Sequence, residues 1–158
     1  MSSYDTALIC SNGHLICSSV ENYPDDLQNF CSKCGAETIE CCPSCKKNLR
    51  GFYNSDDGYI KPVTVESFCF NCGKPYPWTT SMLETMELLI QEDDDLQEQQ
   101  KTSLIESLPD IIVETPKTKL ALARMQKGLI AAGKFTAEGI RQFVIDFGCE
   151  LAKKSLNL

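Results

Sequence analysis

The chain has 158 residues, ten of them cysteine and one histidine, and its formal net charge is −7. This length allows one or two small domains. The negative charge disfavours nucleic-acid binding, which rests largely on positive charge meeting phosphate, and no apolar stretch approaches the roughly 20 residues that a transmembrane helix needs.

A hairpin is predicted over residues 6–18, with its turn at residues 11–13. Asn12-Gly13 is a strong hairpin signal because both residues tolerate positive φ. The turn places Cys10 and His14 on its two sides, where the pair can curl around one metal ion.

Three Cys-x-x-Cys pairs follow: Cys31/Cys34, Cys42/Cys45 and Cys69/Cys72. With Cys10/His14 they supply eight ligands, enough for two tetrahedral zinc sites. Sequential pairing, which needs only local hairpins, gives site one (Cys10, His14, Cys31, Cys34) and site two (Cys42, Cys45, Cys69, Cys72). Crossed pairing would join the first and third pairs and stays open. Cys17 competes with His14 for a ligand position, and Cys41 competes with Cys42.

Nine of the ten cysteines lie at or before Cys72, where apolar residues are too scattered for a conventional core. A segment this small usually needs a metal or disulfides to fold. Disulfides favour secreted proteins, and residues 1–10 lack the basic start and apolar run of a signal peptide. We therefore expect two Zn²⁺ ions per chain and a reducing cytoplasm. Seven zinc-bound thiolates and two Zn²⁺ ions would bring the net charge to about −10.

Two strands are predicted at residues 50–54 and 59–65, joined by a turn at residues 55–58. The sequence Phe-Cys-x-x-Cys-Gly occurs at residues 30–35 and again at 68–73, which indicates a duplicated ribbon plan. Trp78, the only tryptophan, is expected to pack against the ribbon where the helices begin, rather than to contact a ligand.

Helix formers dominate after Trp78, so we predict a double zinc-ribbon domain over 1–79 and a helical domain over 80–158. About four helices are expected there. The first runs over 81–91 behind a Ser81/Glu84 capping box, and the second starts near Asp95 and ends before Pro109. The third begins at Thr115-Pro116 and ends near Gly133. Thr136 caps the fourth, which carries an apolar stripe of Ile140, Phe143, Val144, Phe147 and Leu151.

Charge is divided along the helical half. Residues 92–114 hold eight acids and one lysine, whereas residues 115–158 hold eight bases and three acids. These segments are expected to face each other in a bundle. The predicted class is therefore α+β, a small two-zinc ribbon module of short hairpins and zinc knuckles followed by an α-helical bundle.

Several of these segments carry a resemblance. Ile9-Cys-Ser-Asn-Gly-His, Phe30-Cys-Ser-Lys-Cys-Gly-Ala and Asn71-Cys-Gly-Lys-Pro-Tyr-Pro-Trp-Thr resemble a bacterial domain-of-unknown-function family of small double zinc-ribbon proteins. The similarity continues into the helical tail through Thr115-Pro-Lys-Thr. It implies zinc ligation by Cys10, His14, Cys31, Cys34, Cys42, Cys45, Cys69 and Cys72, without Cys17 or Cys41. It implies no activity.

The expected function is that of a non-enzymatic interaction protein, which docks a protein partner or self-associates through its C-terminal helices. Closed four-ligand sites leave zinc no open position for water, and His14 is needed as a ligand. One alternative is nucleic-acid binding by a cluster of Lys33, Lys46, Lys47, Arg50, Lys61 and Lys74. A thiol redox sensor that uses Cys17 and Cys41 is a further alternative.

Overall fold

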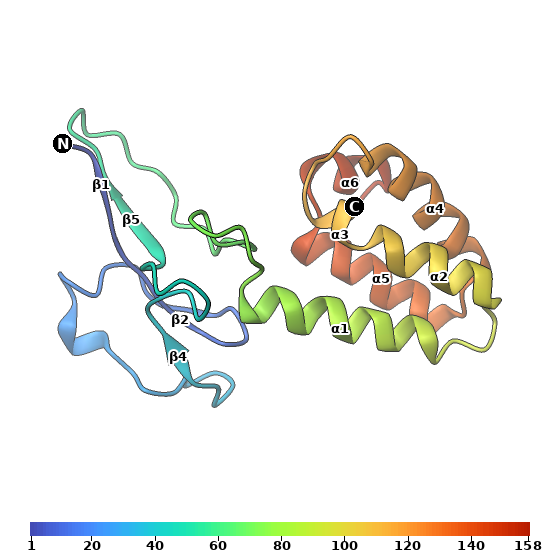
Figure 1. Ribbon diagram of the computed structural model, residues 1–158, viewed down its shortest axis with the longest axis horizontal. Helices are drawn as coiled ribbons and strands as arrows, with labels where there is room; N and C mark the ends of the chain where they lie inside the picture. Colours follow the sequence, from blue (N-terminus) through green and yellow to red (C-terminus); the bar gives the residue numbers. More distant parts are fainter. The chain divides into compact units, whose positions relative to one another are not determined.

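The structure, a computed structural model, describes residues 1–158. By its internal contacts the chain divides into two compact units, Met1–Ser81 and Met82–Leu158. The N-terminal unit holds the strands and the C-terminal unit most of the helices, which confirms the α+β class (Figure 1). The boundary falls inside α1 (Pro77–Gln91), so one helix belongs to both units.

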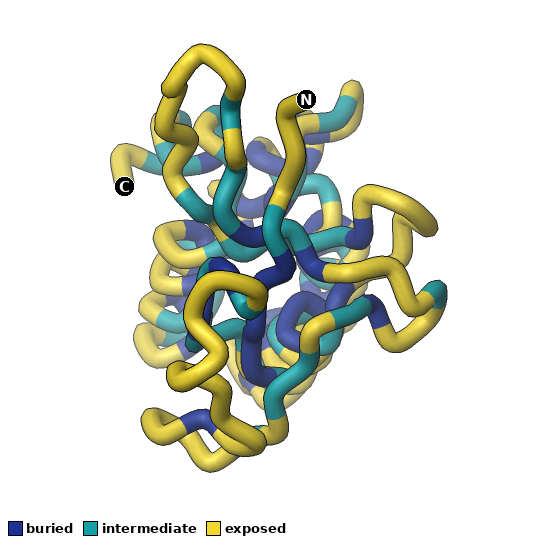
Figure 2. The backbone as a smooth tube through the Cα atoms, turned by 90° about the vertical axis from the view of Figure 1, so that its left-hand side faces the viewer, coloured by how far each residue is buried: buried dark blue, intermediate teal, exposed yellow.

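The N-terminal unit contains two small antiparallel sheets. The predicted hairpin is confirmed: β2 (Leu8–Cys10) pairs with β3 (Leu15–Cys17), and β4 (Thr38–Ile39) pairs with the other edge of β2. The second sheet joins β1 (Ser3–Thr6) to β5 (Arg50–Asn54). A 3₁₀ turn, η1 (Pro24–Asp26), interrupts the exposed loop over residues 21–30 (Figure 2).

The predicted strand at residues 59–65 is wrong. β5 pairs with β1 instead, where Tyr4 lies opposite Tyr53 with ring centroids 4.8 Å apart. Tyr59 and Ile60, at the start of the segment, are 63% and 75% exposed, and Val65, at its end, packs against the core of the unit without strand pairing. Pro62 has no N–H to give to a ladder. β1 therefore offers β5 both side-chain packing and backbone partners that residues 59–65 lack.

The core of this unit is small. Its buried members are Ala7, Ile9, Cys42, Leu49, Cys69, Tyr76 and Trp78, and two of these seven are candidate metal ligands. The predicted packing role of Trp78 is confirmed: its ring stacks on Tyr76, and its Nε1 donates a hydrogen bond to the Glu66 carbonyl at 2.9 Å. A Cβ at Gly13, whose φ is +87°, would lie 3.1 Å from the Trp78 Cβ. Two features of the turn therefore favour glycine at this position: the positive φ and the close approach of the Trp78 side chain.

Six helices are present, rather than about four, and none is long and apolar enough to cross a membrane. After α1 come α2 (Glu98–Ser107), the single turn α3 (Pro109–Ile112), α4 (Thr118–Ala131), α5 (Lys134–Phe147) and α6 (Glu150–Ser155). The largest fully buried apolar side chains of this unit are Ile90, Leu104, Leu108, Ile111, Met125, Ile140 and Val144.

The predicted helix starts are shifted. α1 begins at Pro77 rather than Ser81, because proline at the first helical position leaves no amide unsatisfied. α2 begins after a Gln97/Gln100 capping box, in which the Gln97 amide donates to the Gln100 Oε1 at 2.9 Å, and not at Asp95.

The third and fourth helices are shifted as well. α4 starts at Thr118, two residues beyond Pro116. Thr136 lies buried in the first turn of α5, whose N-cap is Gly133.

The predicted apolar stripe is split between two helices. Ile140, Phe143 and Val144 are buried on α5, but that helix ends at Phe147, and Leu151 belongs to α6. The break follows Gly148, where the Cys149 amide leaves the helix and donates to the Ile111 carbonyl at 2.9 Å. A tertiary hydrogen bond thus ends a helix that the sequence periodicity would continue.

Acidic and basic segments meet at one ion pair, Arg124 of α4 with Glu106 of α2, at 3.7 Å. Asp93, another acid of the same segment, has a different role. The buried carboxylate of Asp93 joins two turns, because it accepts hydrogen bonds from the amides of Asp95 and Leu96 at 2.9 and 3.0 Å and from the Gly133 amide at 3.0 Å. It therefore ties the α1–α2 turn to the start of α5.

Replacement of Asp93 by asparagine should destabilise the helical unit by about 2 kcal/mol at neutral pH, since charge-assisted hydrogen bonds are lost. Burial raises the pKa of Asp93, but hydrogen bonds from Thr136 and from the three backbone amides outweigh it, and the pKa is lowered. A lowered folded-state pKa gives stability that is complete above the unfolded pKa of about 3.9 and disappears as the pH falls through the folded value. Urea unfolding followed by helical circular dichroism should therefore show a difference from wild type that is constant near neutrality and shrinks in acid.

The exposed neighbour Asp94 provides the control, because Asp94→Asn should leave the unfolding curve unchanged. An equal effect of the two substitutions would contradict the role given to Asp93.

Candidate metal centre

Two groups of four ligand side chains come together in the N-terminal unit. The first is Cys10, His14, Cys31 and Cys34, and the second is Cys42, Cys45, Cys69 and Cys72. In each group the ligand atoms lie within 4.8 Å of one another. The arrangement is the sequential pairing, with neighbouring ligand pairs in one site. In each site two cysteines are buried and one, Cys34 or Cys72, is exposed.

The ligand separations fit a tetrahedral metal ion. Zn–S bonds of about 2.3 Å give tetrahedral S–S edges of about 3.8 Å, and a Zn–N bond of about 2.0 Å gives an S–N edge of about 3.5 Å. The Sγ atoms of Cys10 and Cys34 are 3.8 Å apart, and those of Cys42 and Cys72 are also 3.8 Å apart. His14 Nδ1 lies 3.5 Å from Cys10 Sγ and 3.6 Å from Cys31 Sγ. These gaps are far longer than the roughly 2.05 Å of a disulfide bond.

The three Cys-x-x-Cys knuckles share one backbone plan. In each, the amide of the first cysteine donates to the carbonyl five residues later, and the amide four residues after it donates back to its own carbonyl. All six hydrogen bonds are 2.7–2.9 Å long, and they close the knuckles Cys31–Ala36, Cys42–Lys47 and Cys69–Lys74. Backbone hydrogen bonds within each knuckle therefore hold the two cysteines of a pair close together without a contribution from the metal.

The residue after the second cysteine has positive φ in all three knuckles. It is glycine in two of them, Gly35 and Gly73, each at φ +72°, and lysine in the third, Lys46, at φ +62°. The left-handed conformation costs an L-residue with a side chain roughly 1–2 kcal/mol, whereas glycine adopts it freely. Lys46 therefore occupies a position for which glycine is the less strained choice.

The hairpin pair has an equivalent geometry. The Cys10 amide donates to the His14 carbonyl at 3.0 Å, and the Gly13 amide donates to the Cys10 carbonyl at 2.8 Å. The His14 amide lies 3.3 Å from the Cys10 Sγ and donates to it. The tight turn thus aims an amide at a ligand atom, as second-shell groups in metal sites commonly do.

Two asparagines, to which the sequence analysis gave no role at a metal site, donate to ligand sulfurs. Asn12 Nδ2 lies 3.4 Å from Cys34 Sγ, and Asn71 Nδ2 lies 3.5 Å from Cys45 Sγ. Each reaches from one ligand pair to the other pair of its site. The shared signal is Cys-x-Asn, present at residues 10–12 and 69–71.

These donors favour the thiolate form that a metal requires. The Ala36 amide, followed by the Asn12 side chain, lowers the pKa of Cys34 to about 6. The Lys47 amide, followed by Asn71, lowers the pKa of Cys45. In both sites the same pair of donors, one backbone and one asparagine, acts on the second cysteine of a knuckle.

A buried hydroxyl lies beside site two. The Tyr76 side chain is 1% exposed, and its hydroxyl has no hydrogen-bond partner. Burial, and then the neighbouring Cys69, raises the pKa of Tyr76. A metal-bound thiolate at Cys69 would be a suitable acceptor for this donor, so the orphaned hydroxyl fits a loaded site.

The remaining cysteines lie outside both groups. Cys17 is buried in β3 opposite Leu8, and Cys41 forms an isolated bridge with Asn48. Cys149, in the helical unit, precedes α6. Each site thus has four ligands without them.

The chain matches, over residues 3–156, the family described as uncharacterized protein conserved in bacteria, DUF2321. The chain belongs to this family. No curated protein and no solved structure matches it. The description of the family names no activity, so the function is argued from the two candidate sites and the surfaces around them.

The asparagine donors predict a site-specific change in metal release. The purified chain should hold two zinc ions, and Asn71→Ala should release one of them about tenfold faster to a chromogenic chelator. Asn12→Ala should accelerate release of the other ion.

Each variant is the control of the other, and a metal-site cysteine variant identifies which phase belongs to which site. Unchanged release in both variants would contradict the role of the asparagines.

Proposed function

We propose that this chain is a non-enzymatic zinc protein that acts as an interaction adaptor. Two structural zinc ions hold the N-terminal unit, and the helical unit docks a protein partner. The observation that carries the adaptor role is an apolar hollow on the helical unit with unpaired acids at its edge.

The donor sets support zinc in a structural role. Site two offers four cysteines and site one three cysteines and a histidine, the combinations typical of structural zinc. Four protein ligands leave no coordination position for the water that a catalytic zinc activates. The only histidine, His14, is itself part of site one, so no histidine base is left for acid–base catalysis.

The apolar hollow lies on the helical unit, between the C-terminal half of α1 and the start of α5. Its volume is about 610 Å³. Leu88 and Phe135, which line it, are 65% and 78% exposed, an unusual position for large apolar side chains. A surface of this kind is typical of a docking site for apolar groups of a partner.

Acidic residues fix the expected chemistry of the partner. Glu92 and Asp94 line the same hollow and form no ion pair or side-chain hydrogen bond. They are therefore available to a cationic partner, while Leu88 and Phe135 bind its apolar side chains. A basic amphipathic segment combines both properties.

A pull-down from native bacterial lysate with the zinc-loaded full chain tests the adaptor role. Wild type should retain a partner that Phe135→Glu loses almost completely, because a buried charge in the docking surface is strongly unfavourable. Elution should become easier as salt is raised, since the acids contribute to binding.

Ile130 provides the matched control, because it is 87% exposed on α4 and lies outside the hollow. Ile130→Glu should retain the partner. Equal retention by Phe135→Glu and wild type would reject the hollow as the docking site, and a partner lost equally from both variants would point to nonspecific apolar binding.

A further inference from the structure

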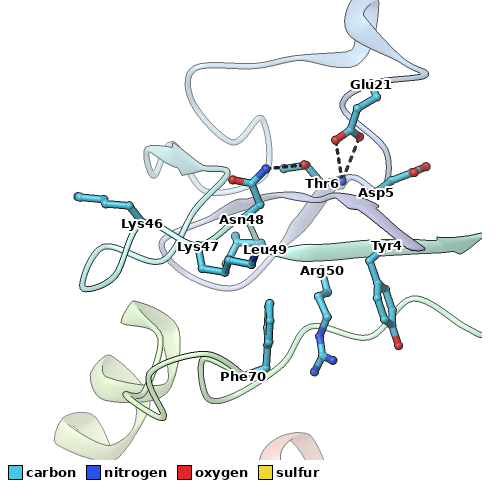
Figure 3. Close-up of a pocket in the computed structure, with 10 residues that line it drawn as sticks. All are labelled: Tyr4, Asp5, Thr6, Glu21, Lys46, Lys47, Asn48, Leu49, Arg50 and Phe70. Atoms are coloured by element: carbon cyan, nitrogen blue, oxygen red, sulfur yellow. Dashed lines mark hydrogen bonds between the residues drawn. The ribbon is translucent and has the colours of Figure 1, made fainter. Parts of the chain in front are cut away.

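The N-terminal unit has a second hollow, beside site two, that the proposed adaptor role does not use. It has a volume of about 650 Å³ and is lined by Tyr4, Asp5, Thr6, Glu21, Lys46, Lys47, Asn48, Leu49, Arg50 and Phe70 (Figure 3). Pockets of this size commonly accept a small-molecule ligand. Three of the six bases considered for nucleic-acid binding, Lys46, Lys47 and Arg50, line it together.

The acids of this hollow are engaged within the protein. Both carboxylate oxygens of Glu21 accept the Thr6 amide, at 3.0 and 3.1 Å (Figure 3). The Asp5 carboxylate accepts hydrogen bonds from the side chains of Asn22 and Asn54. Both carboxylates therefore already accept hydrogen bonds from other groups, and neither forms an ion pair with the nearby lysines.

The lysines, by contrast, have no partners. Lys46 and Lys47 are exposed, and neither ammonium group forms an ion pair or a hydrogen bond. Both follow Cys45 directly, so the knuckle that holds a metal ligand also fixes their backbone. The hollow thus presents two free positive charges on a rigid loop.

Lys46 is also the residue that departs from the knuckle plan. It has positive φ where the other two knuckles have Gly35 and Gly73. The Lys46 side chain makes no polar contact within the protein that would offset this backbone strain. Strained residues of this kind cluster at functional sites, where a ligand makes use of the side chain.

Aromatic rings line the same hollow and lie beside Arg50, whose guanidinium is also ion-paired with Glu66. The guanidinium of Arg50 lies over the Phe70 ring at 4.3 Å and near the Tyr4 ring at 5.1 Å, and Figure 3 shows its side chain running between the two rings. Phe70 is 44% exposed and Tyr4 is 37% exposed. Exposed rings next to positive charge suit a ligand that carries both a planar group and an anionic group.

We infer that this hollow binds a nucleotide, with its phosphate on Lys46 and Lys47 and its base against Phe70. The nucleotide can be free or part of a single strand, because the chemistry of the two is the same. An acidic peptide would satisfy the lysines but would leave the ring without a stacking partner. The acidic charge of the whole chain opposes the approach of any polyanion, so binding should be weak and should depend on salt.

Titration of the zinc-loaded full chain at low salt tests this inference, with AMP followed by NMR and a labelled short oligouridylate followed by fluorescence anisotropy. At least one ligand should bind saturably below millimolar concentration. Lys46→Gly should weaken binding about tenfold and lower the slope of log K against log salt by about one. Phe70→Leu should weaken it about tenfold through lost stacking. Binding of AMP alone identifies a free nucleotide, and tighter binding of the oligonucleotide identifies a strand.

The glycine substitution also separates binding from folding. Because glycine adopts positive φ freely, Lys46→Gly should keep both zinc ions and an unchanged or higher melting temperature. Lys74→Ala is the matched control, since Lys74 holds the position of Lys47 in another knuckle and lies outside the hollow. It should bind as wild type does.

Four results would overturn the inference. They are the absence of saturable binding by both ligands, wild-type affinity in Lys46→Gly, equal affinity for a glutamate oligopeptide, and loss of zinc from Lys46→Gly. The last would mean that Lys46 balances the thiolate charge of site two. None of these results bears on the hollow of the helical unit, so the adaptor role is tested separately.

Discussion

The fold of the N-terminal unit depends on two clusters, each of which brings four candidate ligand side chains together. Its apolar core is a single small cluster, and two members of that cluster are the ligands Cys42 and Cys69. Chain entropy for a segment of this length is far larger than so small a core can offset. A structural zinc site contributes about 10–16 kcal/mol in small peptides near neutral pH. We therefore propose that metal binding at the two candidate sites, rather than a hydrophobic core, is the main source of stability of this unit.

The same constraint organises the surface of the unit. Each knuckle is a short closed loop whose backbone hydrogen bonds leave its side chains free to vary. In the Cys69–Lys74 knuckle Asn71 supports a ligand sulfur, as Asn12 does from the hairpin turn of site one, whereas Phe70 and Lys46 project from site-two knuckles toward the solvent. The Cys42–Lys47 knuckle keeps the backbone of the other two but has Lys46 where they have glycine, so its surface side chain can differ while its backbone fold stays the same.

The sequence predicted the parts of this structure that local chemistry decides. The Asn12-Gly13 turn, the β5 strand and the grouping of ligands that are neighbours in sequence all depend on residues close together in the chain. The errors arose where distant segments decide. β1 displaces residues 59–65 from β5, and a hydrogen bond between Cys149 and Ile111 ends α5. The shifted helix starts have a local cause instead, because Pro77 and the Gln97/Gln100 capping box are stronger starts than Ser81 and Asp95.

The central claim is that metal holds one unit of this chain and not the other. Amide resonances of the full-length, zinc-loaded protein, recorded before and after a strong chelator removes zinc, test it most directly. Resonances of residues 1–76 should collapse to random-coil positions, while those of residues 98–155 should keep their dispersion, because the helical unit has an apolar core of its own. Dispersed resonances from residues 1–76 in the metal-free protein would contradict the account.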